Sequence, residues 1–229
     1  MKTKFGKKTA GFTMVELMIA SAIGCTLCAA AVWFLVEGTR ISLKTTASST
    51  NDLAEWGIFS SMTIDSKIAN GMVMYPDFIK DTISDPANQL DDKNPSQNVG
   101  NVLILTKSHP QIKEPNQKVI KTPIYDQITG YVFDPTYGTL KTFTYVTSDS
   151  EKADGVSVET ILKNNFDNFV MRTIGTNLSA SSFGAAGKAF LCRSKNNRSA
   201  VLNIEVANGN ANMSIGKRKL IEATLYVRG

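Results

Sequence analysis

The stretch KKTAGFTMVELMIA, residues 7–20, decides how the N-terminal part of this chain folds. It opens an apolar run of 25 residues, 12–36, in which Glu16 is the only charged side chain. A helix of that length spans about 37 Å, which is more than the ~30 Å hydrocarbon core of a bilayer. The run therefore predicts a membrane-spanning helix that carries one carboxylate close to its start.

The charges around this run are distributed unevenly. The first eleven residues contain four lysines and no acid: Lys2, Lys4, Lys7 and Lys8. Because basic residues gather on the cytoplasmic side, this pattern places the N-terminus in the cytoplasm and the chain after Glu37 outside it. The formal net charge of +5 falls to +1 without those four lysines. A nearly neutral body disfavours nucleic-acid binding.

Three interpretations of how the segment is processed compete. One is a secretory signal cut after the small residues 29–31, although a charge does not belong inside the apolar region of such a signal. Another is a lipoprotein signal that ends at Cys25, where Ala22 occupies a position that usually holds a larger aliphatic residue. The third is a cut between Gly11, which is small and unhindered, and Phe12, which opens the apolar run.

Only the third interpretation gives Glu16 a physical reason to be there. A carboxylate in the middle of a lipid-embedded helix costs about 2.5–3.5 kcal/mol on insertion scales. A cut after Gly11 creates an α-amine on Phe12, one helical turn from Glu16 in the same chain or in a neighbouring one. The two charges relieve each other's desolvation, and between subunits the pair also fixes the register of the helices. The alternative is that Glu16 reaches the lipid headgroups from the first turn, which does not explain Gly11.

GFTMVELMIA resembles the type III signal of type IV prepilins and type II secretion pseudopilins, over about residues 7–36. The shared features are the lysine-rich leader, Gly11, Phe12, Glu16 and the apolar helix. The resemblance implies that a prepilin peptidase cuts after Gly11 and methylates the amine of Phe12. It also implies that Glu16 aids entry into a helical filament. Because no proline precedes Pro76, the helix looks more like that of a minor pilin or pseudopilin than that of a bulk filament subunit.

The helical pattern continues beyond the membrane, over residues 37–72. Six apolar residues lie within about 90° of one another on a helical wheel, which predicts an apolar face: Leu43, Ala47, Ala54, Ile58, Ile68 and Met72. Three more apolar residues lie on other faces and indicate contacts on more than one side: Trp56, Phe59 and Met62.

Two details of this helix are left open by the sequence. Residues 45–52 are weak helix formers, and Asp52 with Glu55 can form a capping box, so a local break there is an alternative to one helix that runs to about Asn70. Asp65 lies on the predicted apolar face. It is either bonded to the backbone or a lysine of the outer domain, or partly exposed at a domain edge.

From Val99 onward the hydrophobic period changes to two. The strand-like runs cover residues 101–106, 130–134, 139–146, 168–174, 188–194, 200–207 and 220–228. One-sided alternation in the last two runs predicts an antiparallel sheet with one solvent-facing side and the long helix over the other. The predicted fold class is α+β, with a long N-terminal transmembrane and amphipathic helix packed on a mainly antiparallel β-sheet. This layout resembles the larger minor pilins and the J-type pseudopilins.

The expected organisation has four parts. Residues 1–11 form a cleaved leader, residues 12–36 cross the membrane, residues 37–72 continue the helix outside it, and residues 73–229 form a β-rich pilin-like domain. The proline- and aspartate-rich start of the last part, residues 73–98, is expected to be a connecting loop with little regular structure.

The sequence offers little chemistry outside the N-terminal segment. Four aspartates raise the question of calcium, but their spacing is not that of an EF-hand loop: Asp81, Asp85, Asp91 and Asp92. Cys25 and Cys28 have no acidic or histidine partner in the apolar run, and Cys192 is alone in the outer part, which therefore forms no internal disulfide. The single histidine, His109, makes a catalytic triad improbable. No catalytic residue, metal or cofactor is expected.

Small basic patches near the C-terminus leave DNA binding as a minor alternative to solvated turns. They comprise Arg193, Lys195, Arg198, Lys217, Arg218 and Lys219.

The leading hypothesis from the sequence is a structural subunit and not an enzyme. It is a minor pilin or pseudopilin in the inner (cytoplasmic) membrane, with a cytoplasmic N-terminus and a periplasmic or extracellular C-terminal domain. Its expected partners are prepilin peptidase and other pilin or pseudopilin subunits. The alternative is a membrane-anchored extracytoplasmic binding module that enters no filament. The sequence does not distinguish a pilus for adhesion, motility or DNA uptake from a secretion pseudopilus.

Overall fold

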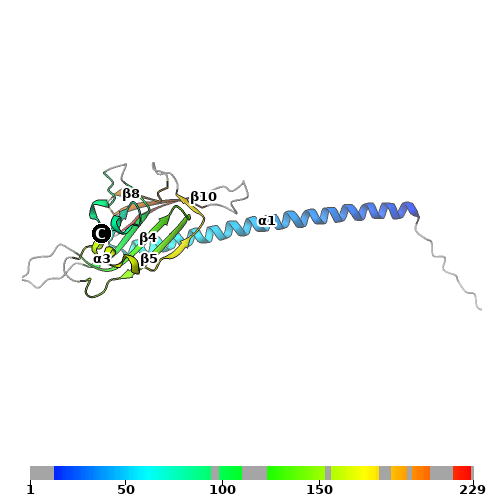
Figure 1. Cartoon of the computed structure of the whole chain (residues 1–229). Helices are drawn as coiled ribbons and strands as arrows, with labels where there is room; N and C mark the ends of the chain where they lie inside the picture. The colour runs from blue at the N-terminus through cyan, green and yellow to red at the C-terminus, as the bar shows by residue number, and fades with distance from the viewer. Residues whose placement is uncertain are drawn as a thin grey trace, which may run out of the picture. The chain divides into compact units, whose positions relative to one another are not determined.

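The computed structural model describes residues 13–93, 98–109, 123–152, 156–180, 187–194, 198–206 and 219–227. The chain divides into two units, Met1–Ala47 and Ser48–Gly229, and each is described by itself. The first contains the N-terminal part of helix α1, and the second contains the end of that helix and all strands (Figure 1). The α+β class predicted from the sequence is confirmed.

Helix α1 runs from Met14 to Ile68 and has no break at residues 45–52. The absence of proline allows its backbone hydrogen bonds to continue for 55 residues. The Ala69 amide still donates to the Asp65 carbonyl at 2.9 Å, just before the Asn-Gly pair. The predicted end near Asn70 is therefore correct to within two residues.

Ten strands follow α1 in chain order. They are β1 Gly71–Tyr75, β2 Val99–Gly100, β3 Val102–His109, β4 Ile124–Asp134, β5 Thr139–Val146, β6 Arg172–Gly175, β7 Leu178–Ala180, β8 Phe190–Ser194, β9 Ser199–Val206 and β10 Lys219–Tyr226. The short helices between them are α2 Lys80–Ile83, η1 Pro86–Asn88, α3 Val158–Asn165 and η2 Phe166–Asn168. Every run predicted to be a strand contributes to one, and the run 139–146 coincides with β5.

The strands form two antiparallel sheets where the sequence predicted one. The first sheet has the order β1-β3-β4-β5-β6, and the second has the order β10-β9-β8-β2, with β7 also paired to β9. Figure 1 shows β4 and β5 together in the first sheet and β8 and β10 in the second. The prediction of one solvent-facing side is wrong for β3, because its residues from Val102 to Thr106 are all buried and so both of its faces are covered.

Two hydrophobic clusters explain why both faces are covered. The larger joins Ile58 and Met62 of α1 to apolar residues of both sheets, including Leu103, Tyr131, Phe190, Leu202 and Leu225. The smaller lies on the other face of the first sheet and joins Ile104, Ile128 and Phe143 to Ile161 and Leu162 of α3. Helix α3 has its own start signal, because the Ser157 hydroxyl accepts a hydrogen bond from the Thr160 amide.

The sequence predicted a connecting loop with little regular structure for residues 73–98, and this is wrong for residues 73–75 and 80–83. Strand β1 pairs with β3 from Gly71 opposite Thr106 to Tyr75 opposite Val102, and Lys80–Ile83 forms the helix α2. The prolines begin only at Pro76, so they do not interrupt the β1 ladder. The strand is stabilised by a partner about thirty residues away, which local sequence does not reveal.

The apolar face predicted for the outer part of α1 is also corrected. Ile58 is 1% exposed as expected, but Ile68 is 54% exposed and Leu43 is 72% exposed. Met62, placed on another face by the sequence, is 0% exposed, and Met72 lies in β1. The helical wheel assumes one straight apolar face along the helix. In the structure, the burial of each residue depends on whether it contacts a sheet.

Asp65 has a partner that the sequence did not anticipate. The Tyr131 hydroxyl of β4 donates to Asp65 Oδ2, and the Ser61 and Tyr131 hydroxyl oxygens are 3.2 Å apart. Burial, followed by the hydrogen bond to Asp65, raises the pKa of Tyr131 well above its usual range. Asp65 is half-buried, as the alternative of a partly exposed acid expected, and among the described residues its side chain bonds to a buried phenol and not to the backbone or a lysine.

A turn before α3 is organised around the carboxylate of Glu151. Its Oε2 accepts hydrogen bonds from the Ser148 amide at 2.8 Å, the Ser148 hydroxyl at 2.7 Å and the Tyr145 hydroxyl at 2.7 Å. The side-chain amide of Asn165, the last residue of α3, donates to Oε1. Burial acts to raise the pKa of Glu151, but these hydrogen bonds outweigh it and hold the pKa below its ordinary value of 4.5.

Replacing Glu151 by glutamine is expected to make the melting temperature depend less steeply on pH below neutrality. Because the folded-state pKa of Glu151 is lowered, its contribution is present above the unfolded pKa and is lost as pH falls through the folded pKa. The wild-type melting temperature should therefore fall more steeply than that of E151Q between about pH 5 and pH 3. D149N is the matched control, because Asp149 lies in the same turn with a fully exposed side chain. Parallel profiles for E151Q and wild type would contradict this prediction.

Candidate functional site

The start of α1 is a capping box made by Thr13 and Glu16. The Thr13 amide and the Thr13 hydroxyl each donate to Glu16 Oε2 at 2.9 Å. In return, the Glu16 amide donates to the Thr13 hydroxyl at 3.3 Å. Thr13 is the N-cap residue and Glu16 the third residue of the helix, which is the spacing that this reciprocal arrangement requires.

The local physics of a helix start explains why these two residue types stand here. The first amides of a helix have no intrahelical acceptor, and in or near a bilayer such unpaired donors are costly. The Thr13 carbonyl accepts the first helical bond, from the Leu17 amide at 3.2 Å, and the box satisfies two further donors. A carboxylate in the first turn also interacts favourably with the positive end of the helix dipole. Glu16 thus has a role within its own helix.

Sequence reasoning missed Thr13, although the signal was present. The pattern Thr-x-x-Glu at residues 13–16, just before an apolar run, is the sequence signature of a capping box. The sequence prediction placed a capping box only at Asp52 and Glu55. Both residues lie inside α1 and begin no helix.

The carboxylate of Glu16 retains capacity for another partner. Both hydrogen bonds from Thr13 end on Oε2, and among the described residues no donor bonds to Oε1. One oxygen can therefore hold the helix start while the other faces a cation outside the helix. Gly11 and Phe12 lie outside the described residues, so the cut, the methylation and the pairing of the Phe12 amine with Glu16 stay predictions.

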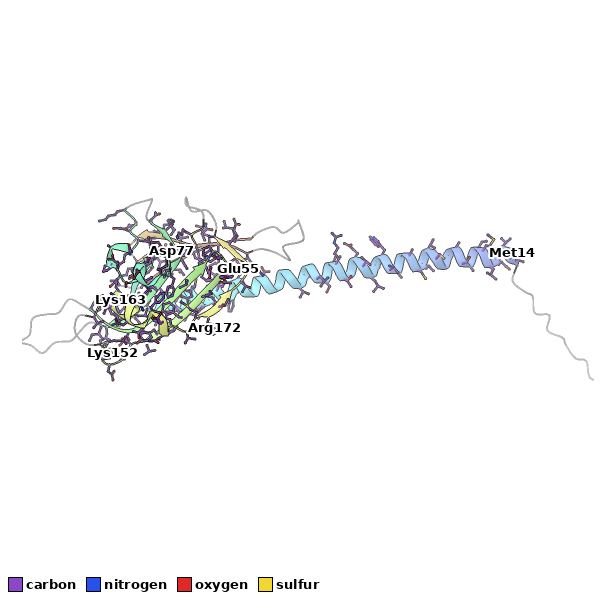
Figure 2. The ribbon with its side chains drawn as sticks, in the orientation of Figure 1. Met14, Glu55, Asp77, Lys152, Lys163 and Arg172 are labelled. Carbon is purple, nitrogen blue, oxygen red and sulfur yellow. The ribbon has the colours of Figure 1, made fainter. Side chains whose placement is uncertain are left out.

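The helix that follows is suited to a membrane. The segment Met14–Leu43 is long and apolar enough to cross a bilayer, with a mean hydropathy of 2.2 over its most apolar window. None of that window is buried within the structure, and Met14 marks the start of this helix in Figure 2. Glu37 and Arg40, 3.9 Å apart, are the next charged residues after Glu16. Residues 14–36 of α1 therefore contain a single carboxylate, at the first turn.

The acidic residues 81–92 form no converging site in the part of the chain that is described. Asp85 accepts from the Ala87 amide at 2.9 Å and caps η1, and Asp91 accepts from the Lys93 amide at 3.3 Å. No group of three or more histidine, cysteine, aspartate or glutamate side chains that could hold a metal occurs among the described residues.

His109 pairs with Asp126, with 2.9 Å between Nδ1 and Oδ2, at the exposed end of β3. Its neighbour Ser108 donates its hydroxyl to Asn70 Oδ1 at 3.0 Å instead. Within the described residues no serine or cysteine is hydrogen-bonded to His109, so the pair has no nucleophile in place.

Three of the six basic residues near the C-terminus lie among the described residues, on separate segments. The Arg198 guanidinium donates to the Asn70 carbonyl and ties the turn between β8 and β9 to the end of α1. Arg193 is exposed on β8, and Lys219 opens β10. Lys195, Lys217 and Arg218 lie outside the described residues. Cys25 and Cys28 are exposed thiols on α1, and Cys192 is a buried thiol of the core.

The comparisons with known proteins bear on the N-terminal segment alone. Residues 6–32 match the family described as the prokaryotic N-terminal methylation motif. No curated protein and no solved structure matches the chain. The matched range contains Gly11, Phe12, the capping box and most of the apolar run. Together with the apolar helix, the motif fits a membrane-anchored protein. The N-terminal segment of this chain is therefore a type IV pilin-like prepilin signal, which continues into α1.

Proposed function

We propose that this chain is a minor pilin or pseudopilin, a structural subunit that initiates, primes or caps a filament. The methylation motif at residues 6–32, with Glu16 in the first turn of an apolar helix, is the observation that carries the proposal. Helix α1 has no proline to bend it, which favours a minor subunit over a bulk subunit. The subunit performs no catalysis.

Processing follows from the same segment. Prepilin peptidase cuts after Gly11, removes the leader 1–11 and methylates the amine of Phe12. Residues 12–36 then hold the subunit in the inner membrane, residues 37–72 continue outside it, and residues 73–229 form the outer domain. The capping box supports a defined helix start at Met14, close to the new N-terminus.

Assembly uses the charge pair that processing creates. The ammonium of Phe12 and the carboxylate of Glu16 pair in low dielectric, and between neighbouring subunits this pair sets the register of the helices. Glu16 Oε1, which has no donor among the described residues, is the atom available to the ammonium. The partners are prepilin peptidase and other pilin or pseudopilin subunits.

The mature N-terminus tests this function directly. Intact mass and N-terminal sequencing of the protein recovered from membranes should give a product that begins at N-methyl-Phe12. A chain that keeps Met1, or one cut near Ala31, would instead support a membrane-anchored binding module that enters no filament. Crosslinking of membranes followed by co-purification then identifies the neighbouring subunits.

Replacing Glu16 by alanine is expected to remove the protein from filaments. Leaving a buried ammonium without its carboxylate costs about 3–5 kcal/mol, which is a large penalty for each subunit added. The measurement is the fraction of protein in sheared, pelleted filaments or in crosslinked ladders. The control is E37Q, because Glu37 is the next carboxylate on α1 and pairs with Arg40 outside the apolar run. Normal incorporation of E16A would rule out the assembly role of Glu16 and leave the cut at Gly11 untouched.

A further inference from the structure

We propose that the open edge of β10 pairs with the same edge of a second copy of this chain and so joins two outer domains. The pairing is antiparallel, with Ala223 of one copy opposite Ala223 of the other. The surface consists of the edge of β10, Lys219–Tyr226, and the groove between that edge and α1. The inference goes beyond the proposed cut after Gly11 and the proposed role in a filament, and neither of these depends on it.

Strand β10 is the longest edge strand in the described sheets. It pairs there with β9 alone, over eight residues and without a register shift. The other edge strands are shorter, from two residues in β2 to five in β1, and the pairing of β6 is interrupted by a register shift. A proline or a bulge commonly protects an edge against further pairing, and β10 contains neither. This edge is therefore suited to accept another strand.

The hydrogen bonds to β9 show which backbone groups of β10 face outward. The Val227 amide donates to the Arg198 carbonyl at 3.1 Å, so the odd-numbered residues of β10 bond to β9. In an antiparallel ladder, the residues between them direct their amide and carbonyl groups to the other side. Within the described part of the chain, no strand pairs with these outward residues, which are Leu220, Glu222, Thr224 and Tyr226. Donors and acceptors that repeat every second residue are what an added extended strand requires.

A groove runs beside the same edge. It has a volume of about 270 Å³ and is lined by the consecutive residues 224–227 and by Thr63, Ser66 and Lys67 of α1. Successive side chains of a strand point to opposite faces of the sheet, so a groove lined by consecutive residues borders the edge itself. An added strand therefore has space between β10 and α1.

The side chains of β10 favour a second copy in one register. Outward residues pair only with outward residues, so the possible registers differ by two residues. One register places Glu222 opposite Glu222 of the second copy, and like charges in that position are destabilising. Centring the pair on Ala223 places Glu222 opposite Thr224 and Leu220 opposite Tyr226. Leu220 is 52% and Tyr226 is 62% exposed in the single chain, so this register covers both apolar side chains twice. A shift of two residues in the other direction leaves Leu220 beyond the end of the second strand.

The same register also extends the larger hydrophobic cluster. Leu225 belongs to that cluster and lies at the groove. Ile221 of the second copy falls opposite Leu225. Ala223, which packs against the cluster, falls opposite its own equivalent. The added strand thus continues the apolar face of the second sheet instead of leaving it to end at β10.

Disulfide crosslinking in membranes tests the register. The full-length chain carries alanine in place of Cys25 and Cys28, which are exposed thiols on α1. In this background A223C should form a disulfide-linked dimer on mild oxidation, because the two Ala223 residues form a non-hydrogen-bonded pair with about 4.5 Å between their Cα atoms. L220C is the matched control. The two copies of residue 220 are separated by six residues along the strand, or about 20 Å, so L220C alone should give no dimer.

Two further measurements address the pairing itself. Co-expressed L220C and Y226C chains should crosslink to each other, because these residues lie opposite each other in the proposed register. T224P in the A223C chain removes an outward amide and leaves the bonds to β9 in place. Its crosslinked fraction should fall about tenfold or more, since the two-fold symmetry removes two hydrogen bonds at once. The urea midpoint of the outer domain should stay close to that of A223C.

The outcomes are distinct. The absence of a dimer in A223C and in the mixed L220C and Y226C chains overturns the pairing. A dimer of L220C alone that is as abundant as that of A223C indicates random collision and also overturns it. A crosslink from A223C to a chain of different mass assigns the edge to another partner and overturns the second copy. The mass of the monomer reports the cut after Gly11 separately, so the proposed function can fail while this pairing holds, and the reverse.

Discussion

A chain in which Gly11 is replaced by leucine is expected to keep residues 1–11 and to remain in the membrane as a full-length precursor. Glycine has no Cβ, so a peptidase can approach the bond after it closely, whereas a branched side chain displaces that bond. A misplacement of about 1 Å can cost roughly 100-fold in rate. Because the Phe12 nitrogen then stays in a peptide bond, no ammonium forms for Glu16, and entry into filaments should be lost as well.

Intact mass spectrometry of membrane fractions measures this result. Wild-type protein should appear at the mass of residues 12–229 plus one methyl group, and G11L at the mass of the complete chain. T9L is the matched control, since Thr9 lies in the same leader but outside the Gly-Phe pair. Equal processing of G11L and wild type would show that the cut does not depend on Gly11, whereas loss of processing in T9L would point to a general effect of bulk in the leader.

The second large effect is expected in the core of the outer domain, at Met62 of α1. Met62 is 0% exposed and belongs to the cluster that joins α1 to both sheets. Truncating such a side chain to alanine leaves a cavity and costs about 2–5 kcal/mol of unfolding free energy. Urea unfolding of the full chain in detergent, followed through the loss of β-sheet signal, should show a markedly lower midpoint for M62A.

Ile64, two residues further along the same helix, provides the control. Its side chain is 54% exposed, and alanine is a better helix former than isoleucine, so I64A should change the unfolding free energy by less than about 0.5 kcal/mol. Equal losses of unfolding free energy in M62A and I64A would contradict the burial of Met62 between α1 and the sheets. The comparison also tests the correction to the apolar face, because the sequence alone placed Met62 off that face.

The N-terminal segment could be interpreted from sequence because its information is local. The apolar run and the absence of proline favour one long helix but leave a break at residues 45–52 open, and the structure has a continuous helix from Met14 to Ile68. The motif around Gly11 and Glu16 is equally local, and residues 6–32 match the methylation family. Thr13 was within reach as well, because its spacing to Glu16 is itself the signature of a helix start.

The strands of the outer domain were identified from their period of two, but their arrangement was not. Alternation along one run shows which residues share a face and not what covers that face. Strand β1 is not recognisable in the sequence, because its partner β3 follows about thirty residues later. Helix α3 covers the second face of the first sheet. The side that was expected to face solvent is therefore buried.

By itself, therefore, the sequence determined the long helix, the single carboxylate of its apolar run at residues 12–36, the positions of most strands and the signal at the N-terminus. Only the tertiary structure decided that Met62 is buried while Ile68 is not, that Asp65 bonds to Tyr131, 66 residues away, and that two sheets form where one was expected. The physical reason is the range of the interactions. Helix propensity, capping and hydrophobic run length act within a few residues, whereas strand pairing and burial depend on segments that meet only after the chain has folded.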